Sequence, residues 1–434
     1  MTSTSPFSTK ILLAGAISLS LFLTNLASNL SAVELPTNPR RADDKVQGSL
    51  VIIGGALRND NAAVWQSIVK EAGGQGSKIA IIPSASANPQ RAAEFAAAAL
   101  NQHGADAFIV PLSTKYTDVD PSKAPHKIRK DPHWLEQIRQ AKAVYFTGGD
   151  QAKITTALRE DNGQPSPMLE AIWALYRHGG VIAGTSAGAA IMSTTMFNNA
   201  KGVLDTLKLG VKDGDEIADG LGFVGPQVFI DQHLIIRGRF ARMLPVMLSK
   251  SYQLGLGIDE NTALLVRQQN EVEIIGYKGA ILFDLSNTTT NLNFTEFNLQ
   301  NARISYLSHG DRFNIHTKQI KPAADKSRVD SVRSEDTDQA PTFHPNILAN
   351  TAVVELMSQL MESSHQTAKG LAFSDHRGSK PQLGFEFTFT KMPDSSAYFS
   401  SITGSEAFTL IRLRLDVVPI TMANQLYQAM PSQR

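Results

Sequence analysis

Short runs of apolar residues, many of them β-branched, alternate with longer amphipathic stretches through the first half of the chain. The apolar runs predict five strands, over residues 50–53, 79–82, 108–110, 143–146 and 181–183. The stretches between them predict five helices, over residues 62–72, 90–103, 134–141, 155–160 and 167–178. Continuous apolar strands that alternate with helices are typical of a parallel sheet covered on both faces. We therefore predict an α/β fold with a mostly parallel, doubly wound sheet flanked by helices.

The pattern of apolar positions changes in the last third of the chain. Residues 271–285 alternate in the manner of a β-hairpin, and residues 346–368 have the spacing of an amphipathic helix. Residues 383–391 and 408–418 alternate like the strands of a half-buried sheet. This mixture predicts a smaller α+β portion at the C-terminus.

These patterns divide the chain into a main domain over residues 48–285 and a C-terminal portion over residues 286–434. Within the C-terminal portion, residues 321–341 are charged and contain prolines. Such a composition buries little apolar surface, so we predict a flexible segment there.

The N-terminus has the features of a secretory signal. Lys10 is the only early charge, residues 11–27 are mostly apolar, and Leu30-Ser31-Ala32 suits a cleavage site. We predict a signal peptide over residues 1–32, followed by a polar linker over residues 33–47, and a secreted or periplasmic protein with no stable membrane span after cleavage. The alternative is an N-terminal membrane anchor, although the apolar run is shorter than the roughly 20 residues that a span needs.

Composition excludes several classes of function. Hydrophobic residues make up 42% of the 434 residues and charged residues 19%, which is enough apolar material for a sizeable core. The formal net charge is +1 without a long basic block, so no nucleic-acid partner is expected. The chain has no cysteine, which excludes disulfides, thiolate zinc sites and cysteine nucleophiles. No metal-ligand spacing is found, and we expect neither a metal nor another cofactor.

Ser186 is the first candidate for chemistry. It stands in Gly184-Thr185-Ser186-Ala187-Gly188, directly after the apolar run 180–183 and before a predicted helix over residues 187–196. A serine on a tight turn between strand and helix exposes its Oγ at the carboxyl end of the sheet, and backbone N–H groups beside it are placed to stabilise an oxyanion. We predict a nucleophile; the alternative is an ordinary turn of small residues.

A nucleophilic serine needs a base, and the base needs a group that orients it. His233 follows the apolar run 227–230 and is the best-placed histidine. Asp259 and Glu260 follow another apolar run, and either can be the orienting carboxylate. Adjacent residues in an extended chain point to opposite sides, so only one of the two can face His233.

Arginines gather shortly after His233, at positions 237, 239 and 242. Three guanidinium groups within six residues suit a substrate that carries carboxylates. The alternative is a solvated basic face that pairs with nearby acidic side chains.

Four segments together resemble cyanophycinase, a serine exopeptidase related to the aspartyl dipeptidases. They are residues 145–151, 184–189, 231–242 and 257–263, and the resemblance extends over residues 48–285. It implies a class I glutamine amidotransferase-like (flavodoxin-like) fold. It also implies cyanophycin as substrate, a polyaspartate with arginine on each β-carboxyl group, from which β-aspartyl-arginine is released.

The resemblance implies a role for individual residues. Ser186 is the expected nucleophile, His233 the general base and acid, and Glu260 the orienting carboxylate, with Asp259 still possible. The backbone N–H groups of Gly149 and Ala187 are expected to form the oxyanion hole. The residues expected to bind substrate are Gln151, Asp231, Gln232, Arg237, Arg239 and Arg242, with Asp231 placed to take a substrate guanidinium.

Three hypotheses about function follow. The first is an exported serine exopeptidase that degrades cyanophycin or short β-aspartyl peptides through a Ser-His-Glu triad and an acyl-enzyme. The second is an aspartyl or isoaspartyl dipeptidase that acts on small peptides and not on the polymer. The third is an exported relative that binds the substrate without cleaving it. The related enzymes also suggest a homodimer.

Overall fold

The computed structural model describes residues 46–117, 120–329, 342–374, 381–400, 407–423 and 430. The predicted signal peptide and nearly all of the predicted linker lie outside the described residues, as do residues 330–341 of the predicted flexible segment. None of the described helices is long and apolar enough to cross a membrane.

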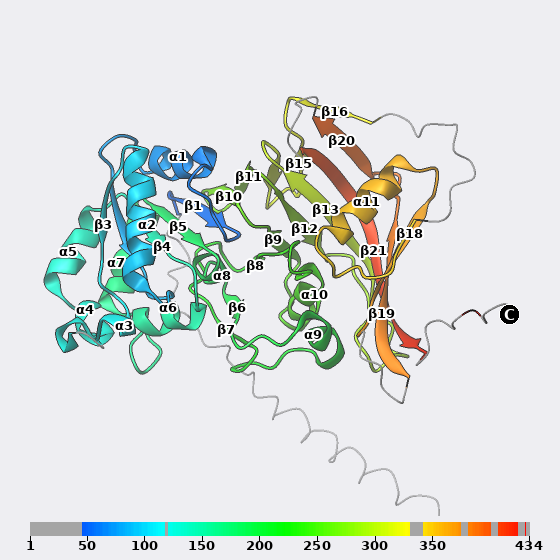
Figure 1. The fold of residues 1–434 in the computed structure, drawn as a ribbon, viewed down its shortest axis with the longest axis horizontal. Coiled ribbons are helices and arrows are strands. Elements are labelled where there is room, and N and C mark those ends of the chain that lie inside the picture. Colours follow the sequence, from blue (N-terminus) through cyan, green and yellow to red (C-terminus); the bar gives the residue numbers. More distant parts are fainter. Residues whose placement is uncertain are drawn as a thin grey trace, which may run out of the picture. The chain divides into compact units, whose positions relative to one another are not determined.

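Five parallel strands form one side of the first sheet, in the order β1-β5-β4-β2-β3, with β3 at the edge (Figure 1). Their bounds are Ser49–Ile53 (β1), Lys78–Ile82 (β2), Asp106–Ile109 (β3), Ala143–Phe146 (β4) and Val181–Thr185 (β5). Four antiparallel strands continue the sheet beyond β1: Thr262–Arg267 (β10), Glu271–Gly276 (β11), Arg312–Asn314 (β14) and Ile320–Lys321 (β15). All five predicted strands are present, which confirms the α/β class.

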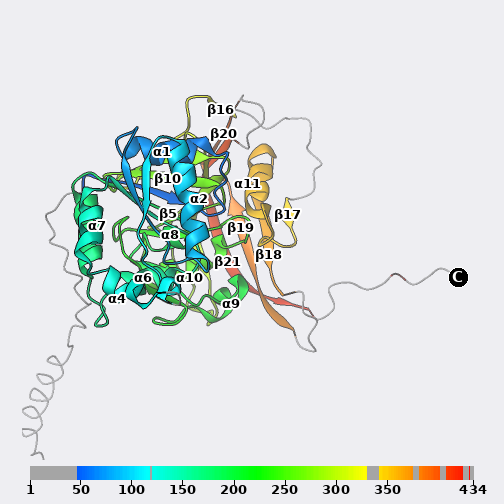
Figure 2. The same cartoon turned by 60° about the vertical axis from the view of Figure 1, so that its left-hand side comes forward.

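Helices cover both faces of this sheet because successive side chains of each strand point to opposite sides. On one face, Val51 and Ile53 of β1 pack in the same core cluster as Trp65 of α1 and Leu100 of α2. On the other face, Leu50 and other strand residues pack against α5, α6 and α7. Figure 2 shows α1 and α2 close together. The sheet is therefore doubly wound, as predicted.

The five helices predicted between these strands are present with similar bounds, and two short helices that the sequence did not predict join them. Their bounds are Ala62–Glu71 (α1), Pro89–Gln102 (α2), Thr114–Thr117 (α3), Pro125–Ile128 (α4), Pro132–Gln140 (α5), Gln151–Leu158 (α6) and Pro167–Arg177 (α7), with a short 3₁₀ helix over Pro121–Lys123. Asn88 and Ser166 each accept a hydrogen bond at the start of the helix that follows, from Arg91 N and Leu169 N. Among the five predicted helices between these strands, α6 differs most, because it is capped by Asp150 and begins four residues before the predicted position.

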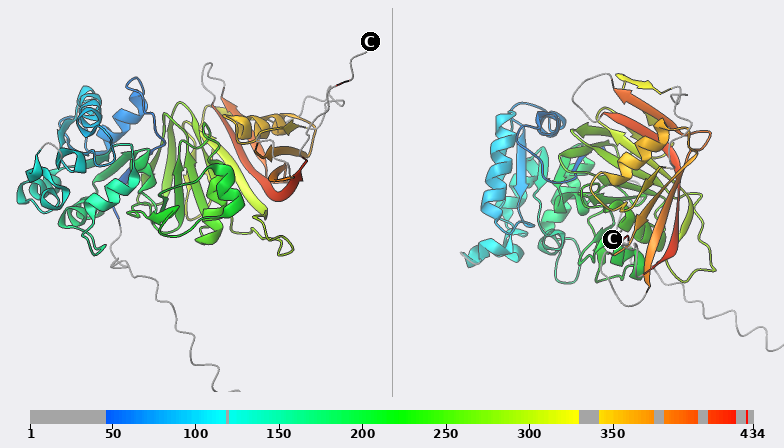
Figure 3. Two further views of the ribbon diagram at one scale, coloured as in Figure 1. Left: turned by 60° about the horizontal axis from the view of Figure 1, so that its bottom comes forward. Right: turned by 45° about the vertical axis from the view of Figure 1, so that its right-hand side comes forward.

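A second sheet contains strands from both parts of the chain, coloured green to red in Figure 3. Its order is β17-β18-β19-β21-β13-β12-β9-β8, with β20 paired to β21 and β16 paired to β20. The bounds are Val228–Gln232 (β8), Leu254–Ile258 (β9), Gly279–Asp284 (β12), Leu299–Ser308 (β13), Lys326–Arg328 (β16), Phe343–His344 (β17), Thr367–Ala372 (β18), Gln382–Thr390 (β19), Ser396–Ser400 (β20) and Phe408–Met422 (β21). The remaining elements are Ala187–Ala190 (α8), Thr195–Phe197 (β6), Val203–Leu209 (α9), Ile217–Asp219 (β7), Phe240–Ser249 (α10) and Ala352–Glu362 (α11).

The second sheet shares one apolar core with α10 and α11. The ring of Phe240 on α10 meets that of Phe387 on β19 edge to face, with centroids 5.7 Å apart. Strands β12 and β13, on either side of residue 285, are neighbours in this sheet. The domain boundary at residue 285 stays a prediction, and the two parts that it separates share a sheet.

Three predictions about the C-terminal half are wrong. The helix predicted over residues 346–368 is confined to α11, and β18 begins at Thr367 inside the predicted range. Residues 271–285 do not form a hairpin, because β11 pairs with β10 and β14 in the first sheet whereas β12 pairs with β9 and β13 in the second. Residues 320–328 hold two strands where a flexible segment was expected to begin. The alternation predicted each strand correctly and carried no information about its partner.

A buried ion pair holds the start of that segment in place. The side chains of Lys326 and Asp311 have no exposed surface, and Lys326 Nζ lies 2.7 Å from Asp311 Oδ1. Lys326 Nζ also donates to Ser308 Oγ and Thr409 Oγ1. Asp311 accepts from Ser308 N, Ala323 N and Thr409 Oγ1. The pair thus joins β16 to β13 and β21. All three N–H donors of the Lys326 ammonium are used, and both oxygens of the Asp311 carboxylate accept hydrogen bonds.

We expect Asp311→Ala to lower the free energy of unfolding by about 3–5 kcal/mol, because it leaves a buried ammonium without its carboxylate. Lys326→Met is expected to cost less, since the Asp311 carboxylate keeps three other donors. Urea denaturation measures both changes. Lys369→Met is the control, because its pair with Glu386 is half exposed and worth about 1 kcal/mol or less. Equal losses in the Asp311 variant and the control would contradict this account.

Candidate active site

Ser186 lies directly after β5, at the carboxyl end of the parallel strands. Its backbone has φ 54° and ψ −108°, a conformation that non-glycine residues rarely adopt. Its N–H donates to the carbonyl of Ile53 at the end of β1, with a nitrogen–oxygen distance of 2.9 Å. This anchored turn directs the side chain toward His233.

The helix that follows Ser186 is a single turn, α8, and not the helix over residues 187–196 that the sequence predicts. The helix does not continue, because the carbonyl groups that its next turn would need accept hydrogen bonds from other segments. Ile191 O accepts from Leu221 N at 2.7 Å, and Met192 O accepts from Val224 N at 2.9 Å. The chain therefore turns away into β6.

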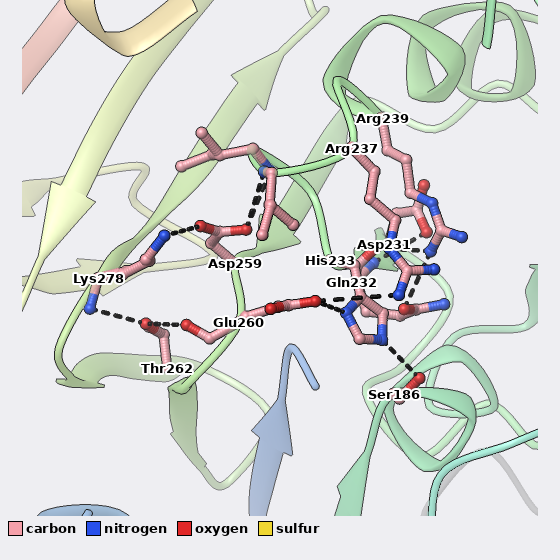
Figure 4. Close-up of polar contacts among 12 residues, drawn as sticks. Ser186, Asp231, Gln232, His233, Arg237, Arg239, Asp259, Glu260, Thr262 and Lys278 are labelled. Atoms are coloured by element: carbon pink, nitrogen blue, oxygen red, sulfur yellow. Dashed lines mark hydrogen bonds and ion pairs between the residues drawn. The ribbon is translucent and has the colours of Figure 1, made fainter. Parts of the chain in front are cut away.

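His233 lies directly after β8 and bridges Ser186 and Glu260 (Figure 4). Its Nε2 is 2.8 Å from Ser186 Oγ, and its Nδ1 is 2.6 Å from Glu260 Oε1. Because an ionised carboxylate only accepts hydrogen bonds, Nδ1 carries the proton and Nε2 is left to accept from the serine hydroxyl. Three side chains, each from a residue that follows a different strand, are thus connected by two hydrogen bonds in series.

The structure separates the two carboxylates that the sequence left open. Glu260 contacts His233, whereas Asp259 points the other way, as Figure 4 shows. Asp259 Oδ1 accepts from the N–H groups of Ile235 and Ile236, both at 3.2 Å, and Oδ2 lies 3.5 Å from Lys278 Nζ. Asp259 therefore fixes the turn that follows His233 and does not touch the imidazole.

Burial lowers the pKa of His233 below its usual value of 6.5. The cationic groups of Arg237 and Arg239 lower it further, and the hydrogen bond to Glu260 opposes both effects. The imidazole is therefore neutral at neutral pH, which is the state that accepts a proton.

Two glycines after β1, in a loop that the sequence places at the carboxyl edge of the sheet without a specific role, hold the parts of the site together. Gly54 O accepts from His233 N and Gly55 O accepts from Asn261 N, both at 2.8 Å. Gly55 has φ +118°, and a Cβ placed on it would lie 2.2 Å from His233 Cε1. The imidazole thus lies directly on a residue that has to be glycine. The sequence signal is the pair of consecutive glycines at the end of the first strand.

The three arginines lie in different environments. The Arg242 side chain is almost fully buried and pairs with Asp231 through Nε and NH2, at 2.7 and 2.8 Å, and its guanidinium carbon lies 3.9 Å from the centre of the Phe197 ring. Arg239 NH1 donates to the carbonyl and side-chain oxygens of Gln232. Half of the Arg237 side chain is exposed, and its NH2 lies 3.9 Å from Glu260 Oε1.

These contacts give Asp231 a different partner from the predicted one. Both of its oxygens already accept from Arg242, and Oδ1 also accepts from Gln232 N. Asp231 is buried and lines neither of the cavities at Ser186. Its carboxylate is therefore not available to a substrate guanidinium in this arrangement.

Two cavities meet at Ser186, His233 and Arg237. The arginine cavity, of about 510 Å³, is lined also by Gly149, Gln151, Lys201, Gln232, Arg239 and Arg242. The α2 cavity, of about 560 Å³, is lined also by Leu57, Ser86, Asn88, Arg91, Phe95 and Tyr145. Both volumes fall within the range of ligand sites, about 300–1,000 Å³.

The arginine cavity contains most of the residues predicted to bind substrate. Gln151 Nε2 donates to Phe197 O at 2.6 Å, which fixes its amide against the wall. Arg239 forms no ion pair with a carboxylate of the described residues, and burial followed by the charge of Arg242 lowers its pKa to about 10. Within the described residues, the N–H groups of Gly149 and Ala187 donate no hydrogen bond, so both are available to a ligand.

We expect Arg237→Gln to raise the pKa of His233, because it removes a cation that disfavours the imidazolium. The imidazole signal, followed by NMR against pH, is then expected to titrate at a higher pH than in the wild type. Arg139→Gln on α5 is the control, since this exposed arginine pairs with Glu136 on its own helix. An unchanged or lower midpoint in the Arg237 variant would argue against the coupling.

We expect Gly55→Ala to displace the His233 ring and to slow the reaction of Ser186 with a fluorophosphonate by about 10²-fold or more. Mass spectrometry of the labelled chain measures the rate. Gly73→Ala is the matched control, because Gly73 has a similar φ of +105° with no atom within 4 Å of the added Cβ. Both variants carry the backbone strain of about 1–3 kcal/mol, and only the first has the clash. Equal labelling rates would show that the ring does not depend on Gly55.

Known proteins resemble this chain over more than half of its length. The sequence model of peptidase family S51 matches residues 50–275. A cyanophycinase from Geminocystis herdmanii is 31% identical over 282 residues, covering 63% of this chain and 96% of the relative. A cyanophycinase from Trichormus variabilis is 27% identical over 290 residues, covering 65% and 91%. The crystal structure of a peptidase from an acI-B1 actinobacterium is 19% identical, with a TM-score of 0.45, and covers 62% of this chain and 98% of its own. This chain therefore belongs to peptidase family S51 and is a cyanophycinase-like serine peptidase.

Proposed function

We propose that this chain is a serine exopeptidase that hydrolyses cyanophycin to β-aspartyl-arginine, with Ser186, His233 and Glu260 as its catalytic triad. The observation that carries the substrate class is the charge of the arginine cavity. Arg242 is neutralised by Asp231 and Lys201 pairs with Glu216, but Arg239 has only neutral partners among the described residues. A cation held in a cavity without a counter-ion favours a carboxylate as ligand.

Cyanophycin carries such carboxylates along its length, and the unit at the carboxyl end of the polymer carries two. Every unit carries the α-carboxylate of its arginine, and the unit at the carboxyl end carries the backbone carboxylate as well. We infer that this terminal unit occupies the arginine cavity, next to Arg239 and the half-exposed Arg237. Holding the unit there places the last backbone amide beside Ser186 Oγ.

The reaction follows from the hydrogen-bond order of the triad. Ser186 Oγ attacks the amide carbonyl while its proton passes to His233 Nε2, and Glu260 stabilises the resulting imidazolium. The N–H groups of Gly149 and Ala187 stabilise the oxyanion, and the loss of one such donor typically costs about 10²–10³ in rate. The imidazolium then protonates the leaving amine of the terminal unit, and a water activated by His233 hydrolyses the acyl-enzyme. A homodimer stays a prediction from the family resemblance.

Incubation of purified protein with insoluble cyanophycin tests the proposal. We expect the wild type to release β-aspartyl-arginine and Ser186→Ala to lower the rate by about 10³-fold or more. Ser67→Ala is the matched control, because the hydroxyl of this partly exposed serine donates to Ala63 O of its own helix and lies outside both cavities at Ser186. Equal rates in the wild type and the Ser186 variant would refute the proposal.

Two further arms of this experiment separate the alternatives. Glu260→Gln is expected to lower kcat, whereas Asp259→Asn is expected to act on the stability of the turn at 235–236. Hydrolysis of small β-aspartyl peptides without release from the polymer would contradict the proposed substrate and favour a dipeptidase.

A further inference from the structure

The α2 cavity differs in chemistry from the arginine cavity, although the two meet at Ser186. Its walls include Leu57, Phe95 and Tyr145, and its one cation beside the shared Arg237 is Arg91, among the described residues that line it. A second cavity of this size that reaches the nucleophile has room for the part of a substrate on the other side of the scissile bond.

Arg91 is exposed and lines the α2 cavity without an ion-pair partner among the described residues. Its backbone N–H donates to Asn88 Oδ1, and its guanidinium forms no ion pair or hydrogen bond with the described residues. It stands in the first turn of α2, which holds no acidic residue, and a cation at that end of a helix is electrostatically disfavoured. An anion bound in the cavity would remove this cost.

Phe95 lies one helical turn further along α2 and lines the same cavity. Its side chain is 45% exposed, and its ring meets that of Trp65 edge to face with centroids 6.3 Å apart. Trp65 is fully buried and therefore holds the Phe95 ring in place. An exposed, fixed aromatic face is suited to stacking with a guanidinium group.

We propose that the α2 cavity is a second subsite, which holds the penultimate unit of the polymer while the terminal unit lies in the arginine cavity. Arg91 pairs with the arginine α-carboxylate of that unit, and Phe95 stacks on its guanidinium. The proposal rests on the proposed function and adds a substrate requirement to it. Two successive β-aspartyl-arginine units are needed for full affinity, which separates a polymer-degrading enzyme from a dipeptidase.

Binding to the Ser186→Ala protein tests the subsite without turnover. The probe is a soluble peptide of two β-aspartyl-arginine units, titrated by calorimetry. We expect Arg91→Ala in this background to raise Kd by about 10-fold or more and Arg91→Lys to restore part of the affinity. Arg139→Ala is the matched control and is expected to leave Kd unchanged. Phe95→Ala is expected to weaken binding more than Phe95→Leu, which keeps an apolar side chain.

A second peptide identifies the group that Arg91 binds. It carries agmatine in place of the arginine of the amino-terminal unit, which removes one α-carboxylate and keeps the guanidinium. We expect it to bind the Ser186→Ala protein about 10-fold more weakly, with little further loss on Arg91→Ala, because the two changes remove the same contact.

Three outcomes would overturn the subsite: equal Kd with and without Arg91, an agmatine penalty that is unchanged by Arg91→Ala, or no binding by the Ser186→Ala protein. Failure of the proposed function is a separate result, since it shows as wild-type protein that releases no β-aspartyl-arginine from cyanophycin.

Discussion

The end of β1 is the constraint on which the candidate site depends. Three consecutive carbonyl groups there, of Ile53, Gly54 and Gly55, accept from Ser186 N, His233 N and Asn261 N. These donors belong to the turns that carry the serine, the histidine and the glutamate, and β1 lies between β5 and β10 in the sheet. The geometry of the proposed triad is therefore set by backbone hydrogen bonds to one short segment, and the side chains complete an arrangement that the backbone already holds.

The same fold gives side chains of one chemical class different roles. Asp259 and Glu260 are neighbours in sequence, and the backbone after β9 sends one carboxylate to the turn at Ile235 and the other to His233. Arg242 stacks on Phe197 and is tied to Asp231, whereas Arg239 meets only neutral oxygens. The buried pair of Arg242 with Asp231 forms part of the wall of the arginine cavity, and in the proposed function Arg239, which has no carboxylate partner among the described residues, supplies the charge for a ligand.

The local sequence predicted the parallel strands, the positions of Ser186 and His233 at strand ends, and a choice of two carboxylates. These features depend on short-range patterns, because apolar runs and the residues that follow them set which side chains reach the carboxyl edge of a sheet. Features that depend on pairing were not predictable in this way. The alternation of residues 271–285 does not reveal that β11 and β12 enter different sheets. The composition around Ser186 does not reveal that Leu221 and Val224 use the carbonyls that a longer helix would need. The partner of Asp231 was missed for the same reason, since Arg242 reaches it only through the helix that follows.

The arrangement of the sheets assigns a structural role to the C-terminal strands. Ser186 follows a strand of the first sheet, whereas His233 and Glu260 follow β8 and β9 of the second. The second sheet continues from β9 through β12 into β13 and β21, which lie beyond the region that the family model matches. The strands that carry the proposed base and its carboxylate are thus supported on one side by the C-terminal part of the chain. Because the 2.8 Å contact between Ser186 and His233 spans the two sheets, any shift of the second sheet acts directly on that contact. The hydrogen bonds from His233 N to Gly54 O and from Asn261 N to Gly55 O tie these turns to the end of β1 in the first sheet, and they oppose such a shift.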